Sequence, residues 1–292
     1  MLLIDTDNAL GSRWGDVDDG FALAALLTSG LPVAALASVA GNTAEARAFA
    51  NNRVLGDLAG YRGRFLRGVG ARRGEPGQRI DEAAELWAGR EGGPEPGEPL
   101  RWLALGPLTN LAAVLAREPS PQIGEVILVG GDLTSRGRWP PFWPVEFNLT
   151  QDRAAARRVF ASGLRLTIVP LDVARRLRAG PRRLAGLTGP LGEHLAQGAQ
   201  RWLWRSRLLK ARGSIALFDL LAAAYVVFPQ HVHTETATVR LTPGMLVERL
   251  PGGEPEGPPA RGVRSVRGVR IVRSFDDEAI WARFRAQING QP

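Results

Sequence analysis

Carboxylates crowd the start of the chain. Asp5 and Asp7 follow a short apolar run, and Asp16, Asp18 and Asp19 come within the next dozen positions. Like charges at this spacing raise one another's pKa unless a cation neutralises them. Carboxylate oxygens, in a chain without cysteine and with no histidine nearby, suit calcium or magnesium better than zinc. The cluster therefore indicates a site for a hard cation, with a solvated acidic loop that caps a helix as the alternative.

A strand and a helix are predicted on either side of this cluster. Residues 2–4 predict a buried strand that ends at the first carboxylates, and residues 21–27 predict a helix whose N-terminus follows the last ones. The same order returns with a strand at residues 33–39, Asn42 after it, and a helix at residues 44–58. Such repeats predict a parallel sheet with crossover helices, in which ligands bind at the carboxyl ends of the strands. Asn42 is therefore expected at the same edge as the first carboxylates.

The later part of the chain continues this pattern. Residues 62–100, rich in Arg, Gly, Pro and Glu, predict a long surface excursion with one helix at residues 80–87. Residues 214–227 predict a mostly buried helix in which Asp219 is the single acid, and a buried carboxylate needs a partner or a metal. Two short strands around a turn at Gly268 are also predicted. Further strands are expected at residues 100–105, 125–129, 165–170 and 236–241, and further helices at residues 109–117, from 152, 191–210 and 276–288.

Composition limits the class of protein. The chain has 292 residues, of which 45% are hydrophobic, and a net charge of +8. It has no apolar run long enough to span a membrane and no signal-peptide pattern, so we expect a soluble, cytoplasmic protein without a membrane partner. The arginines are scattered rather than gathered in a helix or tail, which argues against a nucleic-acid partner. No repeat or domain boundary is evident, so residues 1–292 are expected to form a single domain.

Several short motifs follow one another along the chain in an order that is typical of one protein family. The chain carries DTD and VDD, then AGN, ALGPLTNLA, VGGDL with VEFN, and finally FDLLAAAY. In this it resembles the nucleoside hydrolases, whose best-known members prefer inosine and uridine, and the resemblance runs from residue 2 past residue 245. It implies one α/β domain with a mostly parallel open sheet and crossover helices. It also implies an active site at the carboxyl ends of the strands, with a tightly bound calcium ion.

The resemblance also implies a set of calcium ligands. These are the side chains of Asp7, Asp19 and Asp219 and the backbone carbonyl of Leu105. In the family the ribose hydroxyls bind the calcium too, so Asp219 is also expected beside the substrate. Asp5 and Asp172 are expected to have structural roles.

Other residues match the family's positions for substrate and water. Asp18, Glu146 and Asn148 would hydrogen-bond the ribose, and Asn42 would lie near the nucleophilic water. Asp7 is the candidate general base, a role that calcium assists by lowering the pKa of the water. The implied reaction is displacement at the anomeric carbon through an oxocarbenium-like transition state. Tight binding of both ribose hydroxyls would select ribosides.

The sequence departs from the family pattern on the side of the leaving base. The opening loop is longer, with Trp14 in the extension and Asp16 as an additional carboxylate. Phe218 stands where the family usually has a leaving-group histidine, and Ala88 stands where it has another. The asparagine that usually precedes EFN is not evident. The three histidines lie elsewhere and are expected at the surface: His194, His231 and His233.

Aromatic stacking is a second means of activating a leaving purine in this family. Trp87, with Phe218, is the candidate for contact with the base, and Trp139, Trp143 and Trp202 are further candidates. Packing in the core is the alternative for each of them. The calcium and ribose half of the site thus matches the family, whereas the preferred base is not readable.

Three functions remain open from the sequence. The leading one is calcium-dependent hydrolysis of the N-glycosidic bond of ribonucleosides, in purine or pyrimidine salvage, by a homodimer or homotetramer. A calcium-bound nucleoside- or ribose-binding homologue without turnover is the second, favoured by the missing histidines and disfavoured by Asp7 and Asn42. The third is a phosphohydrolase of the haloacid dehalogenase type, suggested by LLIDTDNAL. That class needs a lysine and a later acidic pair, but the only lysine is Lys210 and the Asp18–Asp19 pair comes too early.

Overall fold

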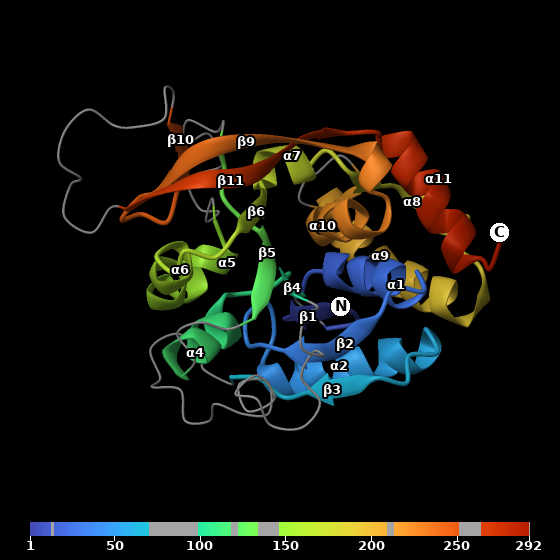
Figure 1. Ribbon diagram of the computed structural model, residues 1–292. Coiled ribbons are helices and arrows are strands. Elements are labelled where there is room, and N and C mark those ends of the chain that lie inside the picture. Colours follow the sequence, from blue (N-terminus) through green and yellow to red (C-terminus); the bar gives the residue numbers. More distant parts are fainter. Residues whose placement is uncertain are drawn as a thin grey trace.

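A nine-stranded sheet forms the centre of the described part of the protein. The computed structural model describes residues 1–12, 15–69, 99–117, 122–133, 146–208, 213–250 and 264–291. The strands are β1 (Leu2–Thr6), β2 (Val33–Ser38), β3 (Arg64–Leu66), β4 (Leu100–Ala104), β5 (Ile123–Val129), β6 (Leu166–Val169), β9 (Val232–Leu241), β10 (Val247–Leu250) and β11 (Arg264–Phe275). They lie in the order β10-β9-β11-β6-β5-β4-β1-β2-β3, as Figure 1 shows. A separate antiparallel pair is formed by β7 (Arg178–Ala179) and β8 (Ile215–Ala216).

Helices cover both faces of this sheet (Figure 1). One face carries α4 (Thr109–Arg117), α5 (Asn148–Gln151) and α6 (Arg153–Phe160). The other carries α1 (Asp18–Leu27), α2 (Glu45–Leu58), α7 (Leu171–Ala174), α8 (Pro181–Ala185), α9 (Gly189–Leu208), α10 (Phe218–Val227) and α11 (Asp277–Ile288). A short 3-10 helix, η1 (Pro229–His231), joins α10 to β9. None of the described helices combines the length and the apolar character needed to cross a membrane.

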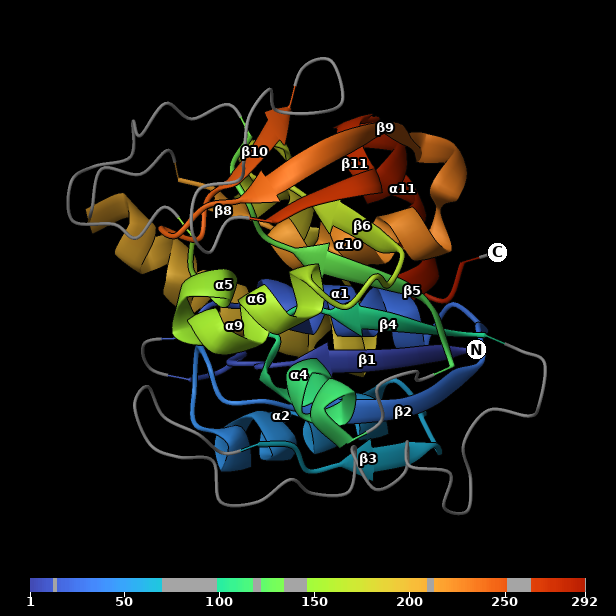
Figure 2. The same cartoon turned by 60° about the vertical axis from the view of Figure 1, so that its left-hand side comes forward.

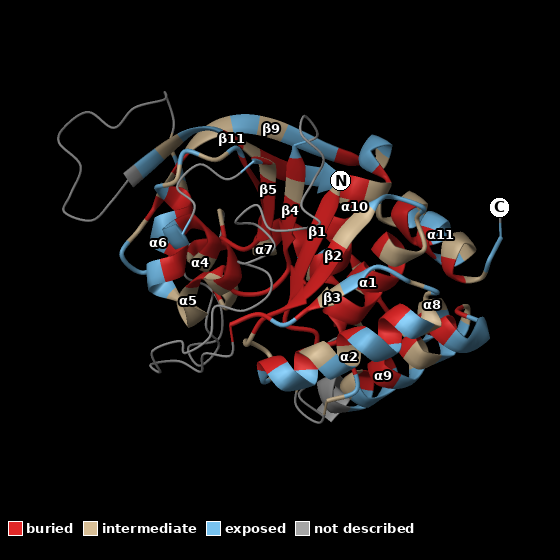
Figure 3. Ribbon diagram, turned by 60° about the horizontal axis from the view of Figure 1, so that its bottom comes forward, coloured by how far each residue is buried: buried red, intermediate tan, exposed pale blue. Residues whose placement is uncertain are grey.

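The alternation of side chains along the strands produces two cores. In β1, Leu2 and Ile4 point to the face that carries α1 and α10, whereas Leu3 points to the face that carries α4. In β4, Leu103 points to the face that carries α1 and α10, and Trp102 points to the face that carries α4. Strands buried on both faces lack an alternation of polar and apolar residues, which is why their sequences read as continuous apolar runs. Figure 3 shows the resulting buried sheet between helices whose outer surfaces are exposed.

The strand order reverses next to β1. β1 pairs in parallel with β2 on one side and with β4 on the other. From β2 the chain proceeds outward to β3, and from β4 it proceeds in the opposite direction through β5 to β6. The later strand β11 lies beside β6, and all these neighbours pair in parallel (Figure 2). Within the described strands of this nine-stranded sheet, the antiparallel pairs are those of β9 with its neighbours β10 and β11. The predicted α/β fold with a mostly parallel open sheet is confirmed, and its switch point lies between the carboxyl ends of β1 and β4.

Two predicted elements were wrong in detail. Residues 214–217 do not begin the buried helix, because they include β8 and because Leu217 N donates to Leu177 O at 2.9 Å; α10 starts only at Phe218. The turn predicted at Gly268 does not exist. β11 runs on through this residue, whose φ of +68° accompanies a register shift between Val266 and Val269. The predicted helix at residues 80–87 lies outside the described residues.

Candidate active site

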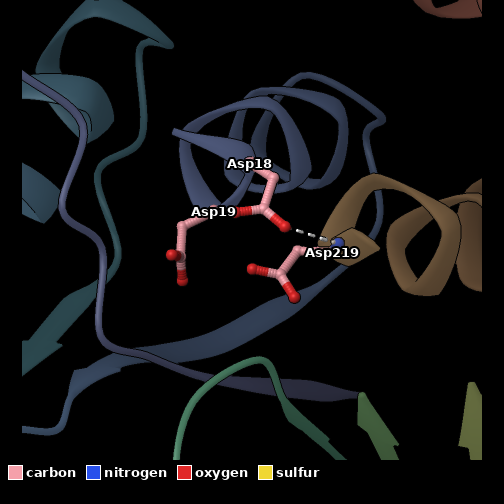
Figure 4. A group of neighbouring side chains, drawn as sticks. All are labelled: Asp18, Asp19 and Asp219. Atoms are coloured by element: carbon pink, nitrogen blue, oxygen red, sulfur yellow. Dashed lines mark hydrogen bonds between the residues drawn. The ribbon is translucent and has the colours of Figure 1, made fainter. Parts of the chain in front are cut away.

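Three aspartates from two helices meet at the switch point. Asp18 and Asp19 open α1, and Asp219 is the second residue of α10. One carboxylate oxygen from each lies within 4.8 Å of the others, and all three side chains are buried (Figure 4). The backbone N–H of Asp219 also donates to Asp18 Oδ2 at 3.3 Å. Helix N-termini favour negative charge, so both helices present these carboxylates where their dipoles stabilise them.

Asp7 brings a fourth buried carboxylate from the end of β1. Its Oδ2 accepts a hydrogen bond of 2.5 Å from the backbone N–H of Asn42, which follows β2. Burial raises the pKa of Asp7 to about 7, although the bond from Asn42 opposes this shift. Gly41 allows the close approach, since a Cβ at this position would lie 2.0 Å from Asp7 Oδ2. The predicted proximity of Asp7 and Asn42 is therefore present in the structure.

The electrostatics of the cluster call for a cation. Burial raises the pKa of Asp18, Asp19 and Asp219 well above the usual value, and neighbouring carboxylates raise it further. Among the described residues, neither Asp7 Oδ1 nor Asp19 Oδ2 has a hydrogen-bond partner, although both atoms are buried. Leaving such oxygens uncompensated is costly, and a divalent cation with a preference for oxygen ligands would satisfy them. The donor set therefore fits a hard metal ion.

A second group of predicted residues lies on the other side of the switch point. Asn148 Nδ2 donates to Leu105 O at 2.8 Å and to Val129 O at 3.1 Å, which joins the ends of β4 and β5. The carboxylate of Glu146 accepts hydrogen bonds from the backbone N–H groups of Gly131 and Leu149. Because Glu146 is buried, its pKa is raised to about 7 despite these two bonds.

Not every predicted residue can be placed in this arrangement. Phe218 precedes Asp219 as the first residue of α10 and is half-buried. The geometry groups Asp18, predicted as a ribose contact, with Asp19 and Asp219, while Asp7 lies outside this set of three. The assignment of individual ligands remains a prediction. Trp14, Trp87, Ala88, Trp139 and Trp143 lie outside the described residues.

Asn110 has a role that the sequence did not reveal. This buried residue of α4 donates from Nδ2 to Asp5 Oδ1 at 2.8 Å and to Ser38 O at 2.9 Å, and its Oδ1 accepts from Val69 N at 2.7 Å. One amide thus links the ends of β1 and β2 to the chain that leaves β3. Burial raises the pKa of Asp5 to about 8, which the bond from Asn110 partly offsets. In the sequence, Asn110 is only a polar residue near the start of a predicted helix. Such a residue is more simply interpreted as a cap of the helix N-terminus than as a link between strands.

The fold and the site together define a class: α/β proteins with a cluster of buried carboxylates at the switch point of a mostly parallel sheet. A model of the family described as inosine-uridine preferring nucleoside hydrolase matches residues 2–282. The chain therefore belongs to this family, as its motifs predicted.

Curated relatives match a shorter part of the chain. The non-specific ribonucleoside hydrolase RihC of Salmonella agona is 32% identical over 135 residues, and RihC of Escherichia coli O1:K1 has the same identity over the same length. The matching segment is 46% of this chain and 42% of the Salmonella protein, so it spans less than half the length of these relatives.

Solved structures share the fold over nearly the whole length. A plant nucleoside hydrolase, PpNRh1, superposes with a TM-score of 0.78 at 22% identity, covering 99% of this chain and 98% of that one. A purine-preferring ribonucleoside hydrolase from Gardnerella vaginalis superposes with a TM-score of 0.76 at 21% identity, covering 99% and 98%. At this level of identity the likeness extends to the fold alone.

Proposed function

We propose that this protein hydrolyses the N-glycosidic bond of ribonucleosides and releases ribose and a free base. The observation that carries the proposal is the group of four buried carboxylates at the switch point, two of whose oxygens lack partners, in a chain of the nucleoside hydrolase family. Such an arrangement has little structural purpose without a cation, because each buried charge destabilises its neighbours.

We infer that the cation is calcium. Asp7, Asp19, Asp219 and the carbonyl of Leu105 would hold it, and Asp18 is close enough to contribute. Oxygen donors alone, several of them carboxylates, are the ligand set that calcium takes in proteins. When bound, a divalent cation supplies Lewis acidity, which makes a water molecule easier to deprotonate.

The chain's own residues then have defined tasks. Asp7 accepts a proton from the attacking water, and the N–H of Asn42 holds its carboxylate in place. The water oxygen forms a bond to the anomeric carbon while the bond to the base nitrogen breaks, and the electron pair of that bond leaves with the base. Glu146 and Asn148, which are hydrogen-bonded to residues at and after the ends of β4 and β5, would bind the ribose hydroxyls. A riboside that lacks a hydroxyl would lose these contacts.

Phe218 keeps a second function open. A nucleoside hydrolase that depends on a histidine before the late aspartate could not protonate the base here, because phenylalanine carries no proton to donate. A calcium-dependent binding protein without turnover is therefore the alternative.

A ribose-release assay with a panel of purine and pyrimidine ribonucleosides tests the proposal. We expect release that a chelator abolishes and calcium restores, and that Asp7→Asn reduces by at least about 100-fold. Calcium binding is measured in parallel by titration calorimetry. Calcium and riboside binding without release would establish the alternative function, and absence of calcium binding would overturn the metal assignment.

A further inference from the structure

The loop between β1 and α1 is seated between two helices. Leu10 of this loop is buried, and it fills a notch that glycines of α1 and α9 leave open. A Cβ at Gly20 would lie 2.7 Å from Leu10 Cδ2, and a Cβ at Gly198 would lie 2.5 Å from Leu10 Cδ1. The backbone N–H of Leu10 also donates to Asn8 Oδ1 at 3.0 Å. At Leu10 the described part of the loop is therefore packed against α9.

Asp16, at the end of this loop, bonds directly to α9. Its Oδ1 accepts a hydrogen bond of 2.9 Å from Trp202 Nε1 and one of 2.7 Å from the backbone N–H of Val17. Both Asp16 and Trp202 are half-buried, so their bond lies at the rim of the cluster, between residues 186 positions apart in the sequence. This bond therefore joins the end of the loop to α9.

The first turn of α1 needs such support. Val17, at its N-terminal boundary, makes no side-chain capping bond. The next two residues, Asp18 and Asp19, are buried carboxylates that repel each other and Asp219. The charge of Asp16 contributes to the raised pKa of Asp18, which places Asp16 at the edge of the same cluster. Repulsion of this kind favours fraying of the turn, and a bond from α9 opposes it.

We propose that Asp16 and Trp202 form a positioning pair that holds the first turn of α1 against α9 and thereby orients Asp18 and Asp19 toward the cation. The proposal rests on the proposed function for the identity of the cation. The pair positions the turn through the hydrogen bond, whereas the charge of Asp16 acts on Asp18 separately. Variants that remove the hydrogen bond must therefore be compared with a variant that removes only the charge of Asp16.

Four variants test the pair. Asp16→Ala removes the acceptor and the charge, whereas Asp16→Asn keeps an acceptor oxygen and removes only the charge. Trp202→Phe keeps an aromatic ring and removes the donor. Trp204→Phe is the matched control, since Trp204 lies on the same helix and is 66% exposed.

Calcium affinity, measured by titration calorimetry, is the first readout. We expect Asp16→Ala and Trp202→Phe each to weaken calcium binding by about tenfold, the lower end of the range for residues that support metal ligands. The double variant should bind calcium no more weakly than Asp16→Ala alone, because Asp16→Ala already breaks the bond that Trp202→Phe removes. Asp16→Asn and Trp204→Phe should stay within about threefold of the wild type, a margin of less than 1 kcal/mol. Additive losses, or equal losses in Asp16→Ala and Asp16→Asn with Trp202→Phe unchanged, would overturn the proposal.

Amide hydrogen exchange in the metal-free protein provides a readout that does not depend on calcium. The first-turn amides of α1 should exchange faster in Asp16→Ala and Trp202→Phe than in the wild type or Trp204→Phe. Unchanged exchange rates in both variants would refute the pair. If the wild type binds no calcium, the metal assignment fails, and hydrogen exchange alone decides whether the pair holds the turn.

Discussion

At the scale of single residues, the contact between Gly41 and Asp7 is the tightest constraint in the site. Replacement of Gly41 by Ala would place a Cβ 2.0 Å from Asp7 Oδ2, and relief of that clash must displace the carboxylate. We expect Gly41→Ala to reduce ribose release by at least about 100-fold, because misplacing a reacting group by about 1 Å has effects of that size. The measurement is kcat/KM with the best nucleoside of the panel.

Gly180→Ala is the matched control for this change. Its added Cβ would meet its nearest neighbours only at 3.9 Å, which is ordinary contact. Equal activity in the two variants would show that the position of Asp7 does not limit the reaction.

Glu146 gives the protein a stability that depends on pH. Burial raises its pKa from 4.5 to about 7, so between these values the folded protein binds a proton that the unfolded chain releases. The free energy of unfolding should therefore decrease as pH rises from about 4.5 through 7, by on the order of 3 kcal/mol for this group. Urea denaturation of metal-free protein at pH 5, 6, 7 and 8 measures the slope.

Glu146→Gln provides the comparison. Glutamine does not titrate, and its amide nitrogen would face a backbone N–H that now donates to the carboxylate, so this variant should be less stable overall. Its slope between pH 5 and 7 should nevertheless be flatter. A slope identical to that of the wild type would assign the pH dependence to other groups.

At the scale of elements, Asn110 holds neighbouring strand ends together. Asn110→Leu would leave Asp5 Oδ1, Ser38 O and Val69 N without this partner in the protein interior. We expect a loss of about 1–3 kcal/mol in the free energy of unfolding and a lower kcat, since the strand that carries Asp7 would no longer be fixed.

Asn289→Ala tests whether the lower kcat expected for Asn110→Leu is specific to that position. Asn289 also makes two amide bonds, with Thr188 N and Gly186 O, but both lie beside the C-terminal helix and outside the candidate site. It should lower stability without changing kcat. If both variants reduce kcat in proportion to their loss of stability, Asn110 is merely structural.

The sequence predicts helices and strands whose apolar pattern matches their burial in the structure. It fails where the pairing of strands far apart in the chain decides the local structure. Strands β1, β2 and β4 were predictable because apolar runs end at Asp, Asn or Gly residues. The start of α10 was not, because the short pair of β7 and β8 is made with residues far away in the chain. Similarly, Gly268 signals a break, and only the partner strand β9 determines that the break is a bulge and not a turn. Asp219 consequently lies in the first turn of its helix instead of near the middle.

At the scale of the whole molecule, the proposed cation would link distant parts of the chain, since Asp18 and Asp19 lie in α1 and Asp219 lies in α10. At about 100 times its dissociation constant, calcium should raise the free energy of unfolding of the wild type by about 2.7 kcal/mol. Asp219→Asn removes the contribution of α10 and should abolish most of this gain. Thermal melts with calcium or chelator provide the measurement.

Asp57→Asn controls for the loss of a carboxylate as such, because Asp57 is exposed on α2. The wild type and this control should respond equally to calcium. A full calcium response in Asp219→Asn would exclude Asp219 as a ligand.

Only part of the site could be predicted at this scale. The carboxylates at the start of the chain and Asn42 are recognisable because each follows an apolar run that predicts a strand. Asp219 is separated from Asp18 by 201 positions, and only the family's motif order connected them. The hydrogen bonds of Asn110 and of Trp202 depend on side-chain directions across the assembled sheet and helices, for which the linear sequence has no signal.

The division of the cluster between the two halves of the chain has a consequence during synthesis. The ribosome releases Asp7, Asp18 and Asp19 well before Asp219, which lies 201 positions after Asp18. If these residues hold calcium as proposed, the nascent chain carries only a partial ligand set until then and should bind calcium weakly. Calcium capture is therefore expected as a late event that selects chains whose α10 has docked on α1, and a truncated product that ends before residue 219 should never acquire it.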